Sequence, residues 1–278
     1  MRISFVKMHG LGNDFVVIDA RGWDRPLQIP QIRHLAHRRM GVGCDQVLSI
    51  EEGSAASEAD FALRIYNSDG SRAEQCGNGV RCVALFLRRR GLVQGSRLVL
   101  GTGAGPVRCR LQGEQDVAVD MGAPRFEPAE IPFLAQQRAS SYALTLNSEH
   151  CSIGAVSMGN PHAVLRVDEV STAPVASLGP AIQMHGRFPK AANVGFMQVI
   201  DPSHIRLRVY ERGAGETLAC GSGACAAVAV GRDQGLLADA VVVDLPGGRL
   251  SVTWSGDERQ PIWMSGPATW VFEGTIDV

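Results

Sequence analysis

The sequence contains very little lysine. Of its 27 basic residues only Lys7 and Lys190 are lysines, and the remaining 25 are arginines. A pyridoxal-phosphate racemase needs a lysine that forms a Schiff base with its cofactor. Because Lys7 falls in the expected opening strand, the sequence disfavours that class of enzyme.

Net charge and long apolar runs are lacking too. The 27 basic residues oppose 28 acidic ones, a net charge of −1, so nucleic acid and membrane surfaces, which require basic clusters, are excluded as main partners. The seven cysteines are an odd number and cannot form a closed disulfide framework. Nothing resembles a signal peptide, and no apolar run approaches the roughly 18 residues of a membrane span. We therefore expect a globular protein of the reducing cytoplasm.

Metal-binding patterns are missing as well. The chain has neither a C-x-x-C pair nor an H-E-x-x-H motif, so we expect no metal site. A length of 278 residues suggests two domains at about 150 residues each.

Two helices are predicted, and each follows a cysteine. Apolar residues at i, i+3, i+4 and i+7 predict a helix after Cys76 that ends near Gly91. The run 224–230, after Cys220, is apolar all round, which is typical of a helix buried on every side. Alternating residues in 61–66 and 205–210 predict a strand before each helix.

These two regions are copies of one pattern. Arg64-Ile-Tyr66 precedes Cys76-Gly-Asn-Gly79 as Arg208-Val-Tyr210 precedes Cys220-Gly-Ser-Gly223. Both offsets are 144 residues (210 − 66 and 220 − 76), and Gly12-Asn13 matches Gly159-Asn160 at 147. The repeat predicts two homologous halves, each with one cysteine at a helix start.

A cysteine at a helix start meets unpaired backbone N–H groups, which stabilise its thiolate. The same groups can hold a carboxylate. One thiolate and one thiol on opposite sides of a bound acid could remove a proton from one face of a carbon and deliver another to the opposite face. The alternatives are two buried packing cysteines, or a redox switch in which Cys76 and Cys220 form a disulfide.

Several motifs then resemble one known family from end to end and in order. Met8-His-Gly-Leu-Gly-Asn-Asp-Phe15, Asn67-Ser-Asp-Gly-Ser71, Cys76-Gly-Asn-Gly-Val-Arg-Cys82, Gly159-Asn-Pro-His162, Glu211-Arg-Gly213 and Cys220-Gly-Ser-Gly-Ala224 are similar to those of the diaminopimelate epimerases. The resemblance implies a cofactor-independent isomerase that interconverts LL- and meso-2,6-diaminopimelate in lysine and peptidoglycan precursor synthesis. It also implies a homodimer, with the strand around 270–272 a candidate for the interface.

By position, the resemblance implies that Cys76 and Cys220 are the acid/base pair and that His162 and Glu211 tune their protonation. Gly77 and Asn78, with Gly221 and Ser222, would offer helix-start donors to the reacting carboxylate. The family often has threonine in place of Ser222. The rest of the substrate would be held by Asn13, Gln46, Asn67, Asn160, Asn193, Glu211 and Arg212. Among these, Arg212 suits the distal carboxylate, because a guanidinium pairs with a carboxylate bidentately.

The expected fold is α/β of the α+β type, with two pseudo-symmetric domains. Each would be a mixed, mostly antiparallel curved sheet or barrel around a central buried helix. We expect residues 1–121 plus 267–278 to carry Cys76, residues 122–266 to carry Cys220, and the active site to lie in the cleft between them. A proline-type racemase or hydroxyproline epimerase is the nearest alternative, and its substrates lack a second carboxylate.

Overall fold

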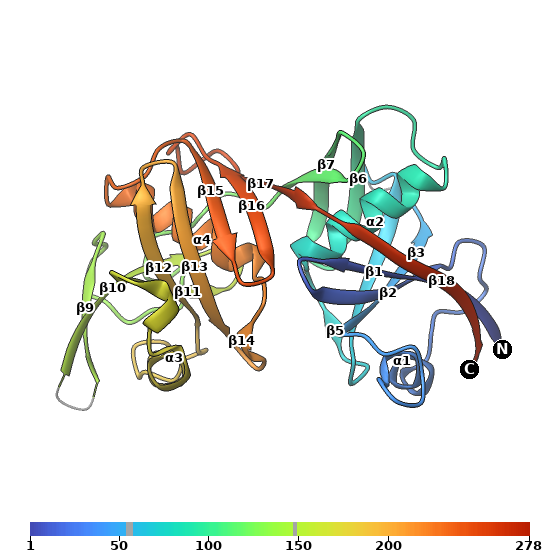
Figure 1. Cartoon of the computed structure of the whole chain (residues 1–278), viewed down its shortest axis with the longest axis horizontal. Helices are drawn as coiled ribbons and strands as arrows, with labels where there is room; N and C mark the ends of the chain where they lie inside the picture. Colours follow the sequence, from blue (N-terminus) through green and yellow to red (C-terminus); the bar gives the residue numbers. More distant parts are fainter. Residues whose placement is uncertain (54–57, 147–148) are drawn as a thin grey trace. The chain divides into compact units, whose positions relative to one another are not determined.

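The computed structural model describes residues 1–53, 58–146 and 149–278. The chain divides into two compact units (Figure 1), which are Met1–Asp120 with Ser265–Val278, and Met121–Met264. These bounds lie one or two residues from those expected from the sequence. We call them the first and the second unit.

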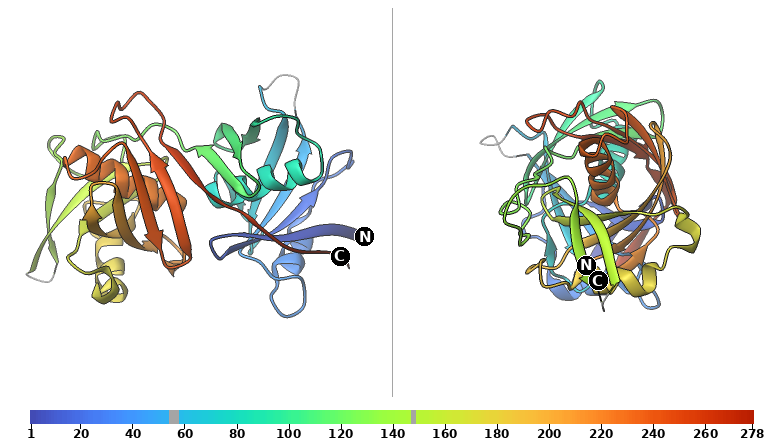
Figure 2. Two further views of the ribbon diagram at one scale, coloured as in Figure 1. Left: turned by 45° about the horizontal axis from the view of Figure 1, so that its top comes forward. Right: turned by 90° about the vertical axis from the view of Figure 1, so that its left-hand side faces the viewer.

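The first unit begins and ends with paired strands. Figure 2 shows the two termini side by side, and the backbone N–H of Val278 donates to the carbonyl of Met1. Its elements are β1 (Arg2–Gly10), β2 (Asn13–Asp19), α1 (Ile29–Ala36), β3 (Gln46–Glu52), β4 (Phe61–Asn67), β5 (Arg72–Ala73), α2 (Gly77–Arg89), β6 (Arg97–Thr102), β7 (Gly105–Gln112), β8 (Asp116–Asp120) and β18 (Thr269–Asp277). Strand β17 (Trp263–Pro267) leads from the second unit into the first.

The second unit repeats the central part of this order. Its elements are β9 (Tyr142–Leu146), β10 (Glu149–Ser157), β11 (Pro161–Arg166), the short 3-10 helix η1 (Val170–Thr172), α3 (Val175–Gln183), β12 (Asn193–Asp201), β13 (His204–Glu211), β14 (Gly215–Thr217), α4 (Gly221–Asp233), β15 (Ala240–Leu245) and β16 (Gly248–Thr253).

The strand register makes the two units equivalent position by position. In the first unit β2 and β3 are parallel and place Phe15 opposite Gln46, and β4 returns antiparallel to β3. In the second unit β11 and β12 are parallel and place His162 opposite Asn193, and β13 returns antiparallel to β12. An offset of 147 residues therefore relates β2 and β3 to their counterparts, so Gln46 corresponds to Asn193 and Phe15 to His162.

Each unit encloses one helix. Helix α2 packs against β1, β2, β3, β7, β8 and β18, and α4 packs against β10, β11, β12, β13 and β16. Cys82 in α2 and Cys225 in α4 are fully buried. The predicted fold class is confirmed, because the described residues form a mixed, mostly antiparallel sheet with four α-helices. No helix of the described part has the length and apolar character to cross a membrane.

Candidate active site

Cys76 occupies the N-cap of α2, with the extended backbone that an N-cap residue requires (φ −151°, ψ 102°). Its carbonyl accepts the first helical hydrogen bond, from the N–H of Val80 at 2.9 Å. Its side chain is half-buried, and Sγ lies 3.8 Å from Oδ1 of Asn13. Nδ2 of Asn78 donates to that same oxygen at 3.3 Å. The first unit thus gathers Cys76, Asn13 and Asn78 at one helix start.

Gln46 and Asn67 form a second polar group in the first unit. They face each other at the ends of β3 and β4, and Nε2 of Gln46 donates to Oδ1 of Asn67 at 3.0 Å. Nδ2 of Asn67 donates to the hydroxyl of Ser71 at 3.0 Å. Oε1 of Gln46 is buried and has no hydrogen-bond partner among the described residues. This oxygen can accept from a substrate ammonium group.

Cys220 occupies the N-cap of α4 in the same extended conformation (φ −119°, ψ 109°). Sγ accepts from the backbone N–H of Gly223 at 3.3 Å and lies 3.6 Å from the hydroxyl of Ser222. A Cβ on Gly223 would come within 3.2 Å of that sulfur, a tight contact that would require the sulfur or its neighbours to shift by a few tenths of an ångström. The glycine is what allows this close approach.

The protonation of Cys220 is set by its surroundings. Burial raises the pKa of the Cys220 thiol, and the negative charge of Glu211 raises it further, against the lowering effects of Ser222 and Gly223. The carboxylate of Glu211 is itself held by a hydrogen bond from the Thr217 hydroxyl. Cys220 is therefore a thiol in the resting protein, beside a carboxylate that can accept its proton.

His162 forms the second polar group of the second unit and is fully buried on β11. Its Nε2 lies 2.9 Å from Oδ1 of Asn160. Burial, helped by the charge of Arg212, lowers the pKa of His162 to about 3. The imidazole is therefore neutral at physiological pH.

Asn193 ties Arg212 to this histidine. Its Oδ1 accepts from the backbone N–H of Arg212 at 2.8 Å, and its Nδ2 lies 3.5 Å from Nε2 of His162. The Arg212 guanidinium is exposed, and its Nη1 donates to the carbonyl of Lys190 at 2.9 Å. This fixes the direction of the side chain while leaving its outer edge in solvent, where a carboxylate can bind.

The low pKa of His162 predicts a pH dependence of folding. The unfolded chain takes up a proton below about pH 6.5 and the folded chain does not, so stability is lost as the pH falls from 6.5 toward 3. At pH 5 this amounts to about 2 kcal/mol relative to pH 7. Denaturant unfolding at both pH values measures it.

The control uses the equivalence of the two units. His162→Phe places in the second unit the residue that the first unit has at Phe15, and should remove most of this loss. His150→Gln, at an exposed position, should leave the loss unchanged. An equal loss in His162→Phe and the parent protein would contradict the assignment.

The candidate residues named above thus form four groups, two in each unit. Sequence reasoning missed the charged side chains behind Asn13, namely Lys7, Asp14, Arg38 and Asp45. It also missed Thr217 behind Glu211. The only signal for the charged group was proximity in sequence, because Asp14 follows Asn13 and Asp45 precedes Gln46. No three His, Cys, Asp or Glu side chains of the described ranges cluster as metal ligands would.

Solved structures of other proteins show which fold this chain has. The phenazine biosynthesis protein of the PhzF family from Bacillus anthracis matches with a TM-score of 0.72 at 17% identity, over 100% of both chains. A hydroxyproline epimerase from Agrobacterium vitis matches with a TM-score of 0.71 at 16% identity, over 99% of this chain and 92% of that one. The fold is therefore the one shared by these proteins.

Comparison of sequences identifies the family to which the chain belongs. A profile described as diaminopimelate epimerase matches residues 5–127 and 154–271. The diaminopimelate epimerase of Thioalkalivibrio sulfidiphilus is 60% identical over 278 residues, which is all of both chains, and that of Nitrosospira multiformis is 51% identical over 100% of this chain and 99% of its own. The chain belongs to the diaminopimelate epimerase family, and is an isomerase of the racemase and epimerase class.

Proposed function

We propose that this protein interconverts LL- and meso-2,6-diaminopimelate by a two-base mechanism that needs no cofactor. The observation that carries the proposal is the repeated helix start, with a cysteine at the N-cap of α2 in one unit and of α4 in the other. Membership of the family supports diaminopimelate as the substrate. The two thiols support a reaction in which protons are removed from and returned to carbon.

In the proposed reaction one cysteine acts on each face of the substrate's α-carbon. The thiolate of one cysteine takes the α-proton, so that a C–H bond breaks and an S–H bond forms. The other thiol then gives its proton to the opposite face of the carbanion. One cysteine gains a proton and the other loses one, and no oxidation or reduction occurs.

The carbanion is the costly intermediate, because an amino-acid α-proton is very weakly acidic. Backbone N–H groups at the two helix starts, at Gly77 and Asn78 and at Gly221 and Ser222, would hold the adjacent carboxylate and stabilise its enediolate form. Such preorganised donors contribute about 3–4 kcal/mol each when they act in a site that excludes water.

The accessory groups then have distinct roles. Glu211 exchanges a proton with Cys220, and the neutral His162 tunes the protonation of the cysteine pair. Arg212 binds the distal carboxylate, since a guanidinium pairs with a carboxylate through two parallel hydrogen bonds. Asn13, Gln46, Asn67, Asn160 and Asn193 hold the ammonium groups and the remaining carboxylate oxygens.

The proposal also covers the cellular location, the pathway and the oligomeric state of the enzyme. It acts in the cytoplasm on a precursor of lysine and peptidoglycan, and works as a homodimer. Val271 and Phe272 on β18 are large apolar side chains, each about half exposed (51% and 48%), and support this strand as the interface.

Incubation of the purified protein with LL-diaminopimelate, without added cofactor, tests the function. Separation of the stereoisomers should show the meso form accumulating to equilibrium, and trans-4-hydroxyproline should remain unchanged. Turnover of hydroxyproline in place of diaminopimelate would contradict the proposed substrate.

A further inference from the structure

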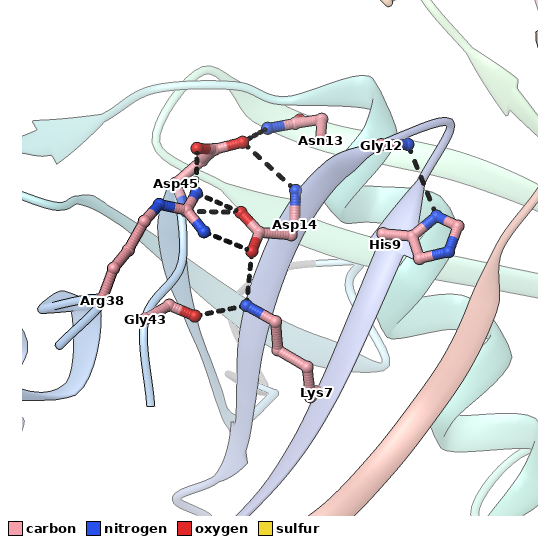
Figure 3. Close-up of polar contacts among 8 residues, drawn as sticks. All are labelled: Lys7, His9, Gly12, Asn13, Asp14, Arg38, Gly43 and Asp45. Carbon is pink, nitrogen blue, oxygen red and sulfur yellow. Dashed lines mark hydrogen bonds and ion pairs between the residues drawn. The ribbon is translucent and has the colours of Figure 1, made fainter. Parts of the chain in front are cut away.

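A network of charges lies behind Asn13 in the first unit (Figure 3). The Asp14 carboxylate accepts hydrogen bonds from Lys7 and from both terminal nitrogens of Arg38, and Lys7 also donates to the carbonyl of Gly43. Arg38 extends to the Asp45 carboxylate at 2.7 Å. The two acids also hold each other, because the backbone N–H of each donates to the side chain of the other.

This network meets the candidate active site at one contact. Oδ2 of Asp45 accepts from Nδ2 of Asn13 at 2.9 Å. A carboxylate only accepts, so the amide nitrogen must face Asp45 and the amide oxygen must point the other way. That oxygen is the atom that lies 3.8 Å from Sγ of Cys76 and 3.3 Å from Nδ2 of Asn78. Asp45, together with the donating Nδ2 of Asn78, thus determines which end of the amide the thiol meets.

The second unit builds the same strands without these charges. Lys7 lies opposite Val16 in the β1–β2 pair, as Ala155 lies opposite Ala163 in the β10–β11 pair. The parallel pairs β2–β3 and β11–β12 fix the other two equivalences by the offset of 147 residues. The positions of Lys7, Asp14 and Asp45 are therefore taken by Ala155, Pro161 and Ala192. The fold of a unit does not require the network.

Stability does not account for the contact between Arg38 and Asp45 either. The side chains of Arg38 and Asp45 are 59% and 46% exposed, and ion pairs in such positions add little to the free energy of unfolding. Burial acts to raise the pKa of Asp14, but the hydrogen bonds from Arg38 and Lys7 outweigh it and hold that pKa well below its usual range. Asp14 therefore remains a carboxylate, and the role of the network is to fix the geometry of the groups around it.

We propose that Asp45, held in place by Arg38 and Asp14, is a positioning residue that turns the oxygen of the Asn13 amide toward the Cys76 thiol. An oxygen in that position accepts a hydrogen bond from the thiol and favours the protonated form of Cys76, the form that donates a proton to substrate. The contacts described above support this orientation of the Asn13 amide. The role of Asp45 in catalysis rests on the proposed function.

The test measures the rate at which iodoacetamide alkylates Cys76 at neutral pH, followed by mass spectrometry of the Cys76 peptide. In Asp45→Ala the amide can turn and donate Nδ2 to the thiolate, so alkylation should be about threefold faster or more. Asp45→Asn keeps an acceptor facing Asn13 and should react at the parent rate. If Asp45→Ala fails to fold, Asp45→Ser, whose shorter side chain also loses the contact, replaces it.

A double-mutant cycle separates positioning from a general disturbance. If Asp45 acts through Asn13, adding Asp45→Ala to Asn13→Ala should not change the alkylation rate further. The proposal is overturned if Asp45→Ala leaves the rate unchanged in the parent, or if it raises the rate equally in both backgrounds. The cycle needs no substrate, so it can succeed even if the protein does not epimerise diaminopimelate.

Discussion

Replacing either Cys76 or Cys220 by alanine is expected to lower kcat by a factor of about 10³ or more, while the protein still folds. A general acid or base contributes about 10²–10⁴ in rate, and in a two-base reaction neither thiol can stand in for the other, because each serves a different face of the carbon. Stereoisomer conversion gives the rate, and circular dichroism with thermal unfolding checks the fold.

Matched controls exist in the same two helices. Cys82 and Cys225 are fully buried in α2 and α4, and burial raises the pKa of the Cys82 thiol, so it is no acid or base at neutral pH. Cys82→Ala and Cys225→Ala should lower the melting temperature but leave kcat within about twofold of the parent, because they remove packing and no reacting group. Near-normal conversion by either Cys76→Ala or Cys220→Ala would refute the two-base mechanism.

Arg212→Ala is expected to raise KM for LL-diaminopimelate about 10²-fold with a smaller change in kcat. Hydrogen bonds to charged groups contribute about 1.5–3 kcal/mol, and a bond to the distal carboxylate is made equally in the ground and transition states. The backbone contact of this residue with Asn193 does not depend on the side chain, so the site should keep its shape. Steady-state kinetics separates the two constants.

Arg206→Ala is the matched control, because Arg206 is an exposed arginine on β13, the strand that leads to Arg212. It should leave KM unchanged, and Arg212→Lys, which keeps the charge but loses the planar fork, should fall between the parent and Arg212→Ala. An unchanged KM in Arg212→Ala would remove the main argument for a dicarboxylic substrate over a hydroxyproline-type one.

Much of the fold could be predicted because its signals are local. The alternation before each cysteine and the apolar periodicity after it predict a strand and a helix, and the offset of 144 residues predicts that these recur. The helix that begins after Cys76 and the all-apolar helix after Cys220 both form where the sequence places them. Each of these two helices is predicted from residues that lie close together in the sequence.

The parts that sequence reasoning missed depend on register between strands. Asp45 is 32 residues from Asn13 in sequence, and only the parallel pairing of β2 with β3 brings the two side chains together. The correspondence of Gln46 with Asn193 needs the same information, because it follows from the parallel pairings of β2 with β3 and of β11 with β12. The neutral state of His162 follows from burial, which no local pattern encodes.

The most direct test of the central claim is the reaction of LL-diaminopimelate in deuterated water, without added cofactor and with the parent protein. Two thiols that exchange with solvent should place one deuterium on the inverted α-carbon of each meso molecule formed, as detected by mass spectrometry and proton NMR. Meso product that retains the original hydrogen at that carbon, or no exchange at all, would contradict the two-base account.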